Sequence, residues 1–332
     1  MLGVLLSRNN HFNPPPGFLS LFPGPLSQAI RRHHVDAVKF LLARFDSHGD
    51  VDRPDAPNAE GDYPLHSAAR LGSIPLVKVL LSHPLSPNIN INSRTSPGER
   101  MTPLDAAANA NHLDLVKYLF ALPDIWRTGL GGQYGGHYGG KTPIYYAVAN
   151  QNMEMIQFLI AQAETVITTP QPNLSPIWMA THLGRLDLVE FLLENGRVGS
   201  EAELVGIYHS CLDSAISKGR VALFDYFFAK QGIPLKKGLL SCAVASGRRE
   251  IFEKLVTGTE FNSVDHRDAL IRAVAKGDLH LMQRLIDMGN LNLKSADPRF
   301  PRIVLSWARG RSDVIELLKR RGIVPHDAVP MW

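Results

Sequence analysis

The sequence contains only two cysteines, Cys211 and Cys242, among its 332 residues. Two thiols are too few for a secreted scaffold held together by disulfides. No apolar stretch reaches the roughly 20 residues of a membrane-spanning helix, and the apolar start at residues 1–6 is too short and lacks the basic residues of a signal peptide. These features predict a soluble protein with free thiols in a reducing compartment, the cytoplasm or the nucleus.

The sequence also lacks an excess of one charge sign. Lysine and arginine total 35 and aspartate and glutamate 31, a net charge of +4. A nucleic-acid binder concentrates its cations on one face, whereas acids such as Glu250 interleave here with basic pairs such as Arg248-Arg249. The 13 histidines are scattered, without the paired spacing of a metal site. We therefore expect no nucleic-acid partner, no metal and no cofactor.

What the sequence does contain is a motif that recurs nine times. Each copy has two apolar segments separated by a turn residue, which we call its anchor. Successive anchors lie 28 to 40 residues apart. The anchors of copies one to nine are His33, Gly72, Asn111, Gln151, Gly184, Gly219, Gly247, Gly277 and Gly310.

Three columns of this alignment keep their chemistry. Seven positions before the anchor the residue is always Leu or Ile: Leu26, Leu65, Leu104, Ile144, Ile177, Leu212, Leu240, Leu270 and Ile303. Four before it the residue is always small: Ala29, Ala68, Ala107, Ala147, Ala180, Ala215, Ala243, Ala273 and Ser306. Eight after it the residue is always large and apolar: Leu41, Leu80, Leu119, Leu159, Leu192, Phe227, Leu255, Leu285 and Leu318.

The spacing predicts two short helices per copy, one on each side of the anchor. Apolar positions 7, 4 and 3 before the anchor share one helix face, and those 4, 5 and 8 after it share another. In the first five copies a proline opens the first helix, as its fixed φ favours. The residue nine before the anchor is predicted to cap that helix. These caps are Gly24, Thr102, Thr142, Ser175, Ser210, Gly238 and Asp268.

The segment Thr102–Ala107, with Pro64–Ala69 and Gly184–Leu193, closely resembles the ankyrin repeat, whose fingerprint is Thr-Pro-Leu-His-x-Ala followed by a second helix. The resemblance implies an all-α ankyrin-repeat solenoid of about nine helix–turn–helix repeats with finger loops. It also implies that His66 is structural and bridges loops. Each helix pair hides its apolar face only against its neighbours.

The same resemblance sets the expected domain organisation. Residues 24–323 form the repeat array, with copies six to nine degenerate. Residues 1–23 are a proline-containing N-terminal extension or cap, and residues 324–332 are a C-terminal tail.

The resemblance implies a non-catalytic protein-interaction module that binds another protein along a concave groove and extended finger loops, with the chain itself a monomer. The groove positions, one and two before the anchor, change from copy to copy and include Ala275-Lys276. The most unusual of the three long loops, residues 126–141, is glycine-rich and carries tyrosines as antibody loops do. A linker-like insertion is the alternative. The candidate partner-binding residues are Tyr63, Arg70, Arg100, Asn109, Tyr134, His137, Tyr138, Asn150 and His182.

Two other functions compete with this interpretation. The chain could be a substrate-recognition adaptor for a larger complex such as a ubiquitin ligase. Residues Gly135–Thr142 also match the phosphate-loop pattern G-x-x-x-x-G-K-[ST], the signature of a nucleotide-binding enzyme. A phosphate loop follows a buried strand, whereas glycines precede this segment and Pro143 follows it. The sequence therefore favours a protein that is not an enzyme.

Overall fold

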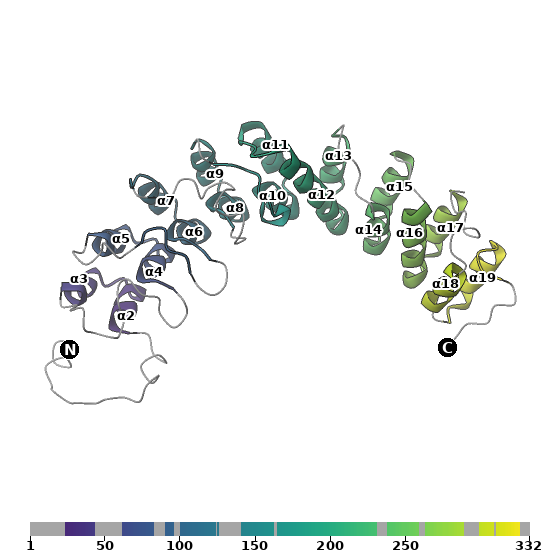
Figure 1. Ribbon diagram of the computed structural model, residues 1–332, viewed down its shortest axis with the longest axis horizontal. Coiled ribbons are helices and arrows are strands. Elements are labelled where there is room, and N and C mark those ends of the chain that lie inside the picture. The colour runs from purple at the N-terminus through teal and green to yellow at the C-terminus, as the bar shows by residue number, and fades with distance from the viewer. Residues whose placement is uncertain are drawn as a thin grey trace, which may run out of the picture. The chain divides into compact units, whose positions relative to one another are not determined.

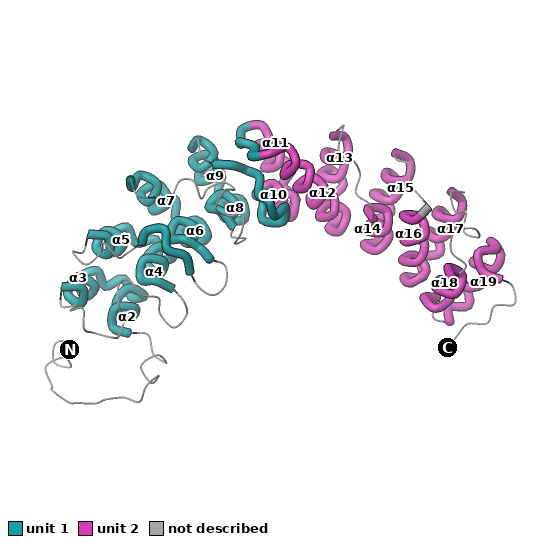
Figure 2. Tube along the Cα trace, in the orientation of Figure 1, with its two compact units in different colours: residues 1–176, 195–199 teal, residues 177–194, 200–332 magenta. Residues whose placement is uncertain are grey.

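The computed structural model describes residues 24–43, 62–82, 90–95, 100–123, 125, 141–162, 165–230, 238–258, 263–288, 299–308 and 310–325. The regular elements in these residues are α-helices, apart from one 3-10 turn, Pro172–Leu174, and one isolated bridge between Val166 and Arg197. The chain divides into two compact units (Figure 2). Unit 1 comprises residues 1–176 and 195–199, and unit 2 comprises residues 177–194 and 200–332.

Unit 1 contains the helix pairs of copies one to four. They are α2 (Pro25–Arg31) with α3 (Val35–Ala43), α4 (Pro64–Arg70) with α5 (Ile74–Leu81), α6 (Pro103–Asn109) with α7 (Leu113–Phe120), and α8 (Pro143–Ala149) with α9 (Met153–Ile160). The first helices α2, α4, α6 and α8 pack against one another in chain order, and the second helices form an adjacent layer (Figure 1).

Unit 2 contains the pairs of copies five to nine, apart from the end residues Pro176 and Asn195. They are α10 (Pro176–Leu183) with α11 (Leu186–Asn195), α12 (Glu201–Lys218) with α13 (Val221–Phe228), α14 (Leu239–Ser246) with α15 (Arg249–Gly258), α16 (Ser263–Lys276) with α17 (Leu279–Asp287), and α18 (Phe300–Ala308) with α19 (Ser312–Arg320). The first helices α12, α14, α16 and α18 again pack in chain order.

The turn between the two helices is the same in nearly every copy. All nine anchors have a left-handed backbone, with φ between 55° and 84°. In copies one to eight the anchor N–H donates to the carbonyl three residues earlier, and the next N–H donates to the carbonyl of the small column, at 2.8 to 3.2 Å. These bonds satisfy carbonyls that a helix end leaves open. The anchor alignment made from the sequence is therefore confirmed.

The conserved columns form the core of each unit. In copies one to eight the Leu or Ile column is at most 4% exposed and the alanine column at most 7% exposed. The large column after the anchor is buried in copies two to nine, and Leu41 in copy one is half-buried. A methyl group at the alanine column lets neighbouring first helices approach closely, so this column positions one repeat against the next.

Copy nine departs from the expected columns. Ile303 is 38% exposed and Ser306 is exposed, whereas α18 buries Phe300, Val304 and Ala308. The turn bond also shifts, because the Arg311 N–H donates to Ala308. The assignment of Ile303 and Ser306 to core columns was wrong. In this copy the first helix presents a different face to its neighbour, and this change brings its tryptophan, Trp307, to the surface.

Two predicted helix caps, Ser210 and Asp268, were also wrong. Both lie inside longer helices, since α12 begins at Glu201 and α16 at Ser263. The proline that starts the first helix in copies one to five is replaced by Cys211 and by Ala269 in these copies. Without proline nothing forces the preceding residue out of the helical region. The true cap of α12 is Ser200, whose Oγ accepts the Glu203 N–H at 3.2 Å.

The predicted cap Thr102 is confirmed and forms a capping box with Asp105. The Thr102 Oγ1 accepts the Asp105 N–H at 3.2 Å, and the Asp105 carboxylate accepts the Thr102 N–H at 2.9 Å. Burial raises the pKa of Asp105 to about 6, against a smaller opposing effect of its bonds to Thr102. Folding therefore binds a proton to Asp105 between roughly pH 4 and pH 6.

We expect this carboxyl to lower stability as the pH rises from 4 to 7. In that window the folded state holds more protons than the unfolded state, so the free energy of unfolding falls, by roughly 3 kcal/mol for a shift of about two pKa units. Asp105→Asn keeps an acceptor oxygen but does not titrate. Urea unfolding at pH 4, 5, 6 and 7 should show the variant gaining stability relative to the wild type as the pH rises; parallel pH profiles would contradict the assignment.

Candidate functional site

The structure aligns three of the predicted partner-binding residues in unit 1. Arg70, Asn109 and Asn150 are exposed and lie at the carboxyl ends of α4, α6 and α8, three first helices that pack in succession. The Arg70 guanidinium forms an ion pair with Asp62. We call these three residues the first-helix row. They present a cation and two amides on one layer of helices.

Bonds between repeats hold this row in place. The Asn150 Nδ2 donates to the carbonyls of Ala108 and Asn109 at 3.0 Å each. The His112 Nε2 lies 2.9 Å from the Arg70 carbonyl oxygen. The side chain of Asn150 therefore also fixes one repeat against the next. Within the described residues, the Asn109 Nδ2 donates only to the Met101 sulfur, at 3.9 Å. Asn109 therefore has the exposed amide of the row that does not join two repeats.

The remaining predicted residues lie in different surroundings. Tyr63 is half-buried before α4, with its ring centroid 5.6 Å from that of His66. Arg100 is exposed and has a left-handed backbone with φ of 51°. Tyr134, His137 and Tyr138 lie outside the described residues.

His182 belongs to unit 2 and to α10. Its ring stacks on that of Trp178, with centroids 5.0 Å apart and planes at 24°. Burial, followed by the positive charges of Lys218 and Arg220, lowers the pKa of His182. The imidazole therefore stays neutral to a lower pH than a free histidine.

The fingerprint histidine, His66, bridges two repeats as the resemblance implied. It is fully buried, and its Nε2 lies 2.8 Å from the Met101 carbonyl oxygen in the loop before α6. Burial lowers the pKa of His66, so the neutral ring is favoured. This bond ties copy two to the loop of copy three.

The last residues of the phosphate-loop match, Lys141 and Thr142, lie at the start of the first helix of copy four, α8. Lys141 holds its ammonium 5.6 and 5.8 Å from the ring centroids of Tyr145 and Tyr146. Thr142 is the N-cap of α8, a helix of seven residues, and Pro143 fills its first position. A proline has no N–H to give to a phosphate at that position. The rest of the match, residues 135–140, lies outside the described residues.

Other kinds of site find little support in the described part of the chain. It contains no group of three or more His, Cys, Asp or Glu residues able to hold a metal ion. None of its helices has both the length and the apolar character to cross a membrane. Neither Cys211 nor Cys242 forms a disulfide within the described residues. Burial raises the pKa of the Cys211 thiol to about 12, so this group is a poor nucleophile.

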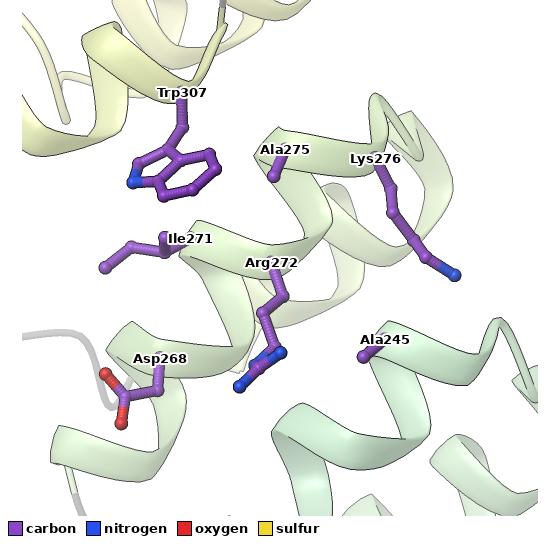
Figure 3. Close-up of a pocket in the computed structure, with 7 residues that line it drawn as sticks. All are labelled: Ala245, Asp268, Ile271, Arg272, Ala275, Lys276 and Trp307. Atoms are coloured by element: carbon purple, nitrogen blue, oxygen red, sulfur yellow. The ribbon is translucent and has the colours of Figure 1, made fainter. Parts of the chain in front are cut away.

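Unit 2 contains a surface cavity of about 500 Å³ that spans three first helices (Figure 3). Two of the residues that line it, Ala275 and Lys276, are at positions that the sequence assigned to the groove. Its lining residues are Ala245 from α14, Asp268, Ile271, Arg272, Ala275 and Lys276 from α16, and Trp307 from α18.

Sequence reasoning missed Trp307, although a signal was present. Three positions before the anchor the other eight copies have small or β-branched residues, all of them buried, whereas Trp307 is 42% exposed. A large aromatic ring in such a column is out of place in a repeat core. That departure marks a residue with a surface role. The buried members are Ile30, Ala69, Ala108, Val148, Thr181, Ile216, Val244 and Val274.

Comparison with known proteins identifies ankyrin repeats in residues 26–160. A family model described as ankyrin repeats (3 copies) matches residues 26–129, and a second, described as ankyrin repeats (many copies), matches residues 104–160. The ankyrin repeat domain of Bcl-3, a member of the IkappaB protein family, aligns with a TM-score of 0.48 and 20% identity over 69% of this chain and 96% of that chain.

Two curated proteins are similar in sequence. Alpha-latrocrustotoxin-Lt1a of Latrodectus tredecimguttatus is 34% identical over 95 residues, 29% of this chain. The ankyrin repeat and KH domain-containing protein mask-1 of Caenorhabditis elegans is 24% identical over 273 residues, 79% of this chain. The chain spans only 6% and 10% of the lengths of these two relatives. The family models cover residues 26–160, so this part of the chain consists of ankyrin repeats, and copies five to eight share its left-handed anchors and buried columns.

Proposed function

We propose that this chain is a non-catalytic protein-binding module whose partner lies across its first helices and finger loops. Ankyrin repeat domains are typically protein-interaction modules. Extended surfaces of stacked repeats are also what solenoid proteins use for binding. The free thiols of Cys211 and Cys242 support a reducing compartment, the cytoplasm or the nucleus.

One observation carries this proposal: the repeats share their core columns but differ at their exposed first-helix ends. The alanine column is buried in all four copies of unit 1. Beside it, the residue two positions before the anchor changes from the exposed Arg70 to the exposed Asn109 and then to the half-buried Ala149, and the exposed Asn150 stands one position later. Packing fixes the core, and the Asn150 amide also joins two repeats. The side chains of Arg70 and Asn109 are the exposed groups of the row that a partner would select. Such a row gives polar contacts that set specificity.

The glycine-rich finger is proposed as a second contact region. Tyr134 and Tyr138 would act as aromatic anchors, with His137 between them as a polar contact. Tyrosine contributes a large contact area for two side-chain torsions, so ordering it on binding costs little entropy. Tyr63 and Arg100 would extend this region from the preceding fingers.

Affinity capture from a cell lysate, quantified by mass spectrometry, tests the proposal. We expect the full chain to recover a defined partner, and Asn109→Arg or the double variant Tyr134→Ser/Tyr138→Ser to reduce that recovery at least fivefold. Gln157→Arg is the matched control, because it adds the same charge at an exposed position of the second helix α9. Equal recovery by all four proteins would contradict the proposed surface.

A further inference from the structure

The cavity of unit 2 has an apolar side and a cationic side. Figure 3 shows the Trp307 ring of α18 above Ile271, next to Ala275. Arg272 and Lys276 extend from α16 on the side facing α14, and Asp268 lies toward the start of α16. An occupant would therefore meet an aromatic ring and aliphatic carbons on one side and two cationic groups on the other.

The cations of this cavity differ from three other cations of unit 2 that are paired between repeats. Arg249, Lys254 and Arg284 each form an ion pair with a carboxylate of another helix pair, at 2.5 to 3.4 Å. Arg272 and Lys276 are both exposed and form no ion pair within the described residues. With Asp268 as the third charge, the lining carries a net charge of about +1, which favours an acidic occupant.

The apolar side is large enough to hold a bulky side chain. Trp307 is 42% exposed, and Ile271, Ala275 and Ala245 are half-buried. Cavities of roughly 300 to 1,000 Å³ with apolar walls and a few polar groups are typical binding sites. A tryptophan in such a position is also the residue type most often found at the energetic centre of an interface.

We propose that this cavity binds a short acidic segment of a partner protein, with one aromatic or large aliphatic side chain next to a carboxylate. The apolar side chain packs between Trp307 and Ile271, and the carboxylate pairs with Arg272 and Lys276. Asp268 excludes a second carboxylate from the start of α16, so the acid has one orientation. The inference rests on the proposed function and names the partner chemistry for unit 2.

A phage-displayed library of random twelve-residue peptides, selected on the full chain, tests this inference. We expect enriched peptides to contain Phe, Trp, Leu or Ile within three residues of Asp or Glu. Fluorescence anisotropy of the best peptide should then show binding at least tenfold weaker to Trp307→Ala and three- to tenfold weaker to Arg272→Gln. Replacing the acid of the peptide by its amide should weaken binding by a similar factor.

Arg302→Gln is the matched control, because it removes a positive charge from an exposed position of α18 without changing the cavity lining. It should leave the affinity unchanged, and Trp307→Phe should retain most of it. Circular dichroism melts of all variants establish that they fold. No enrichment, or peptides that lack acids or bind Trp307→Ala as well as the wild type, would overturn the inference. Partner capture that still depends on Asn109 would then leave the proposed function standing.

Discussion

Replacing Ala107 with leucine is expected to lower the free energy of unfolding by roughly 1–3 kcal/mol. The Ala107 side chain is fully buried in α6, which packs against α4 on one side and α8 on the other. The added carbons have no free volume to enter, so α6 must move away from one neighbour. Urea unfolding followed by circular dichroism measures the loss.

The matched control is Ala121→Leu, which adds the same carbons at an exposed residue that ends α7. That change is expected to stay within about 0.5 kcal/mol of the wild type, as is usual for surface substitutions. If Ala107→Leu also unfolds like the wild type, the alanine column does not set the distance between repeats.

The repeat itself could be predicted because its turn and core impose separate, periodic requirements. Glycine at six of the nine anchors indicated a left-handed turn, but nothing in the residue types of His33 or Gln151 requires one. Their φ values of 56° and 55° became predictable only through alignment with the glycines. The left-handed conformation of His33 and Gln151 is therefore predictable from the other copies but not from these two residue types alone.

The prediction failed where a copy loses a local constraint. Helix starts were correct where proline follows the cap, as at Pro103, and wrong at Ser210 and Asp268, where helix-compatible residues follow. In copy nine the alignment gave the correct second helix, because Leu318 is buried, but the wrong face of the first. The alignment columns identify residues that are compatible with a core. They do not determine the rotation of a degenerate helix about its own axis, and this rotation decides which face is buried.

The candidate site was less predictable, because it depends on how side chains reach across repeats. The sequence indicated that Asn150 and Lys276 lie near a groove. It did not reveal that the Asn150 amide bonds two carbonyls of the preceding repeat, nor that Lys276 shares a cavity with Trp307. Both facts require distances between copies, which periodicity does not supply.

Gly72→Ala is expected to destabilise the chain by roughly 1.5–3.5 kcal/mol, the sum of a backbone cost and a steric cost. Its φ of 69° costs an alanine roughly 1–2 kcal/mol. Its new Cβ would also lie 2.5 Å from the His112 ring, which must move and weaken its bond to the Arg70 carbonyl, a loss of roughly 0.5–1.5 kcal/mol. Gly247→Ala isolates the backbone cost, because its φ is 71° but the nearest atom, the Lys276 Nζ, is 3.6 Å away. Chemical unfolding should therefore show the smaller loss for Gly247→Ala.

The double variant Gly72→Ala/His112→Ser should recover the part of the loss caused by the ring. Copies one and two already combine an anchor that has a side chain, His33, with a small residue, Ser73, at the position corresponding to His112. The Ser73 Oγ caps α5 by accepting the Leu76 N–H at 3.4 Å, so serine also suits the start of a second helix. A double-mutant cycle should give a coupling of about 1 kcal/mol between the two positions. Strict additivity would mean that glycine is needed at this anchor only because of its positive φ, and that the His112 ring of the following repeat does not restrict the residue there.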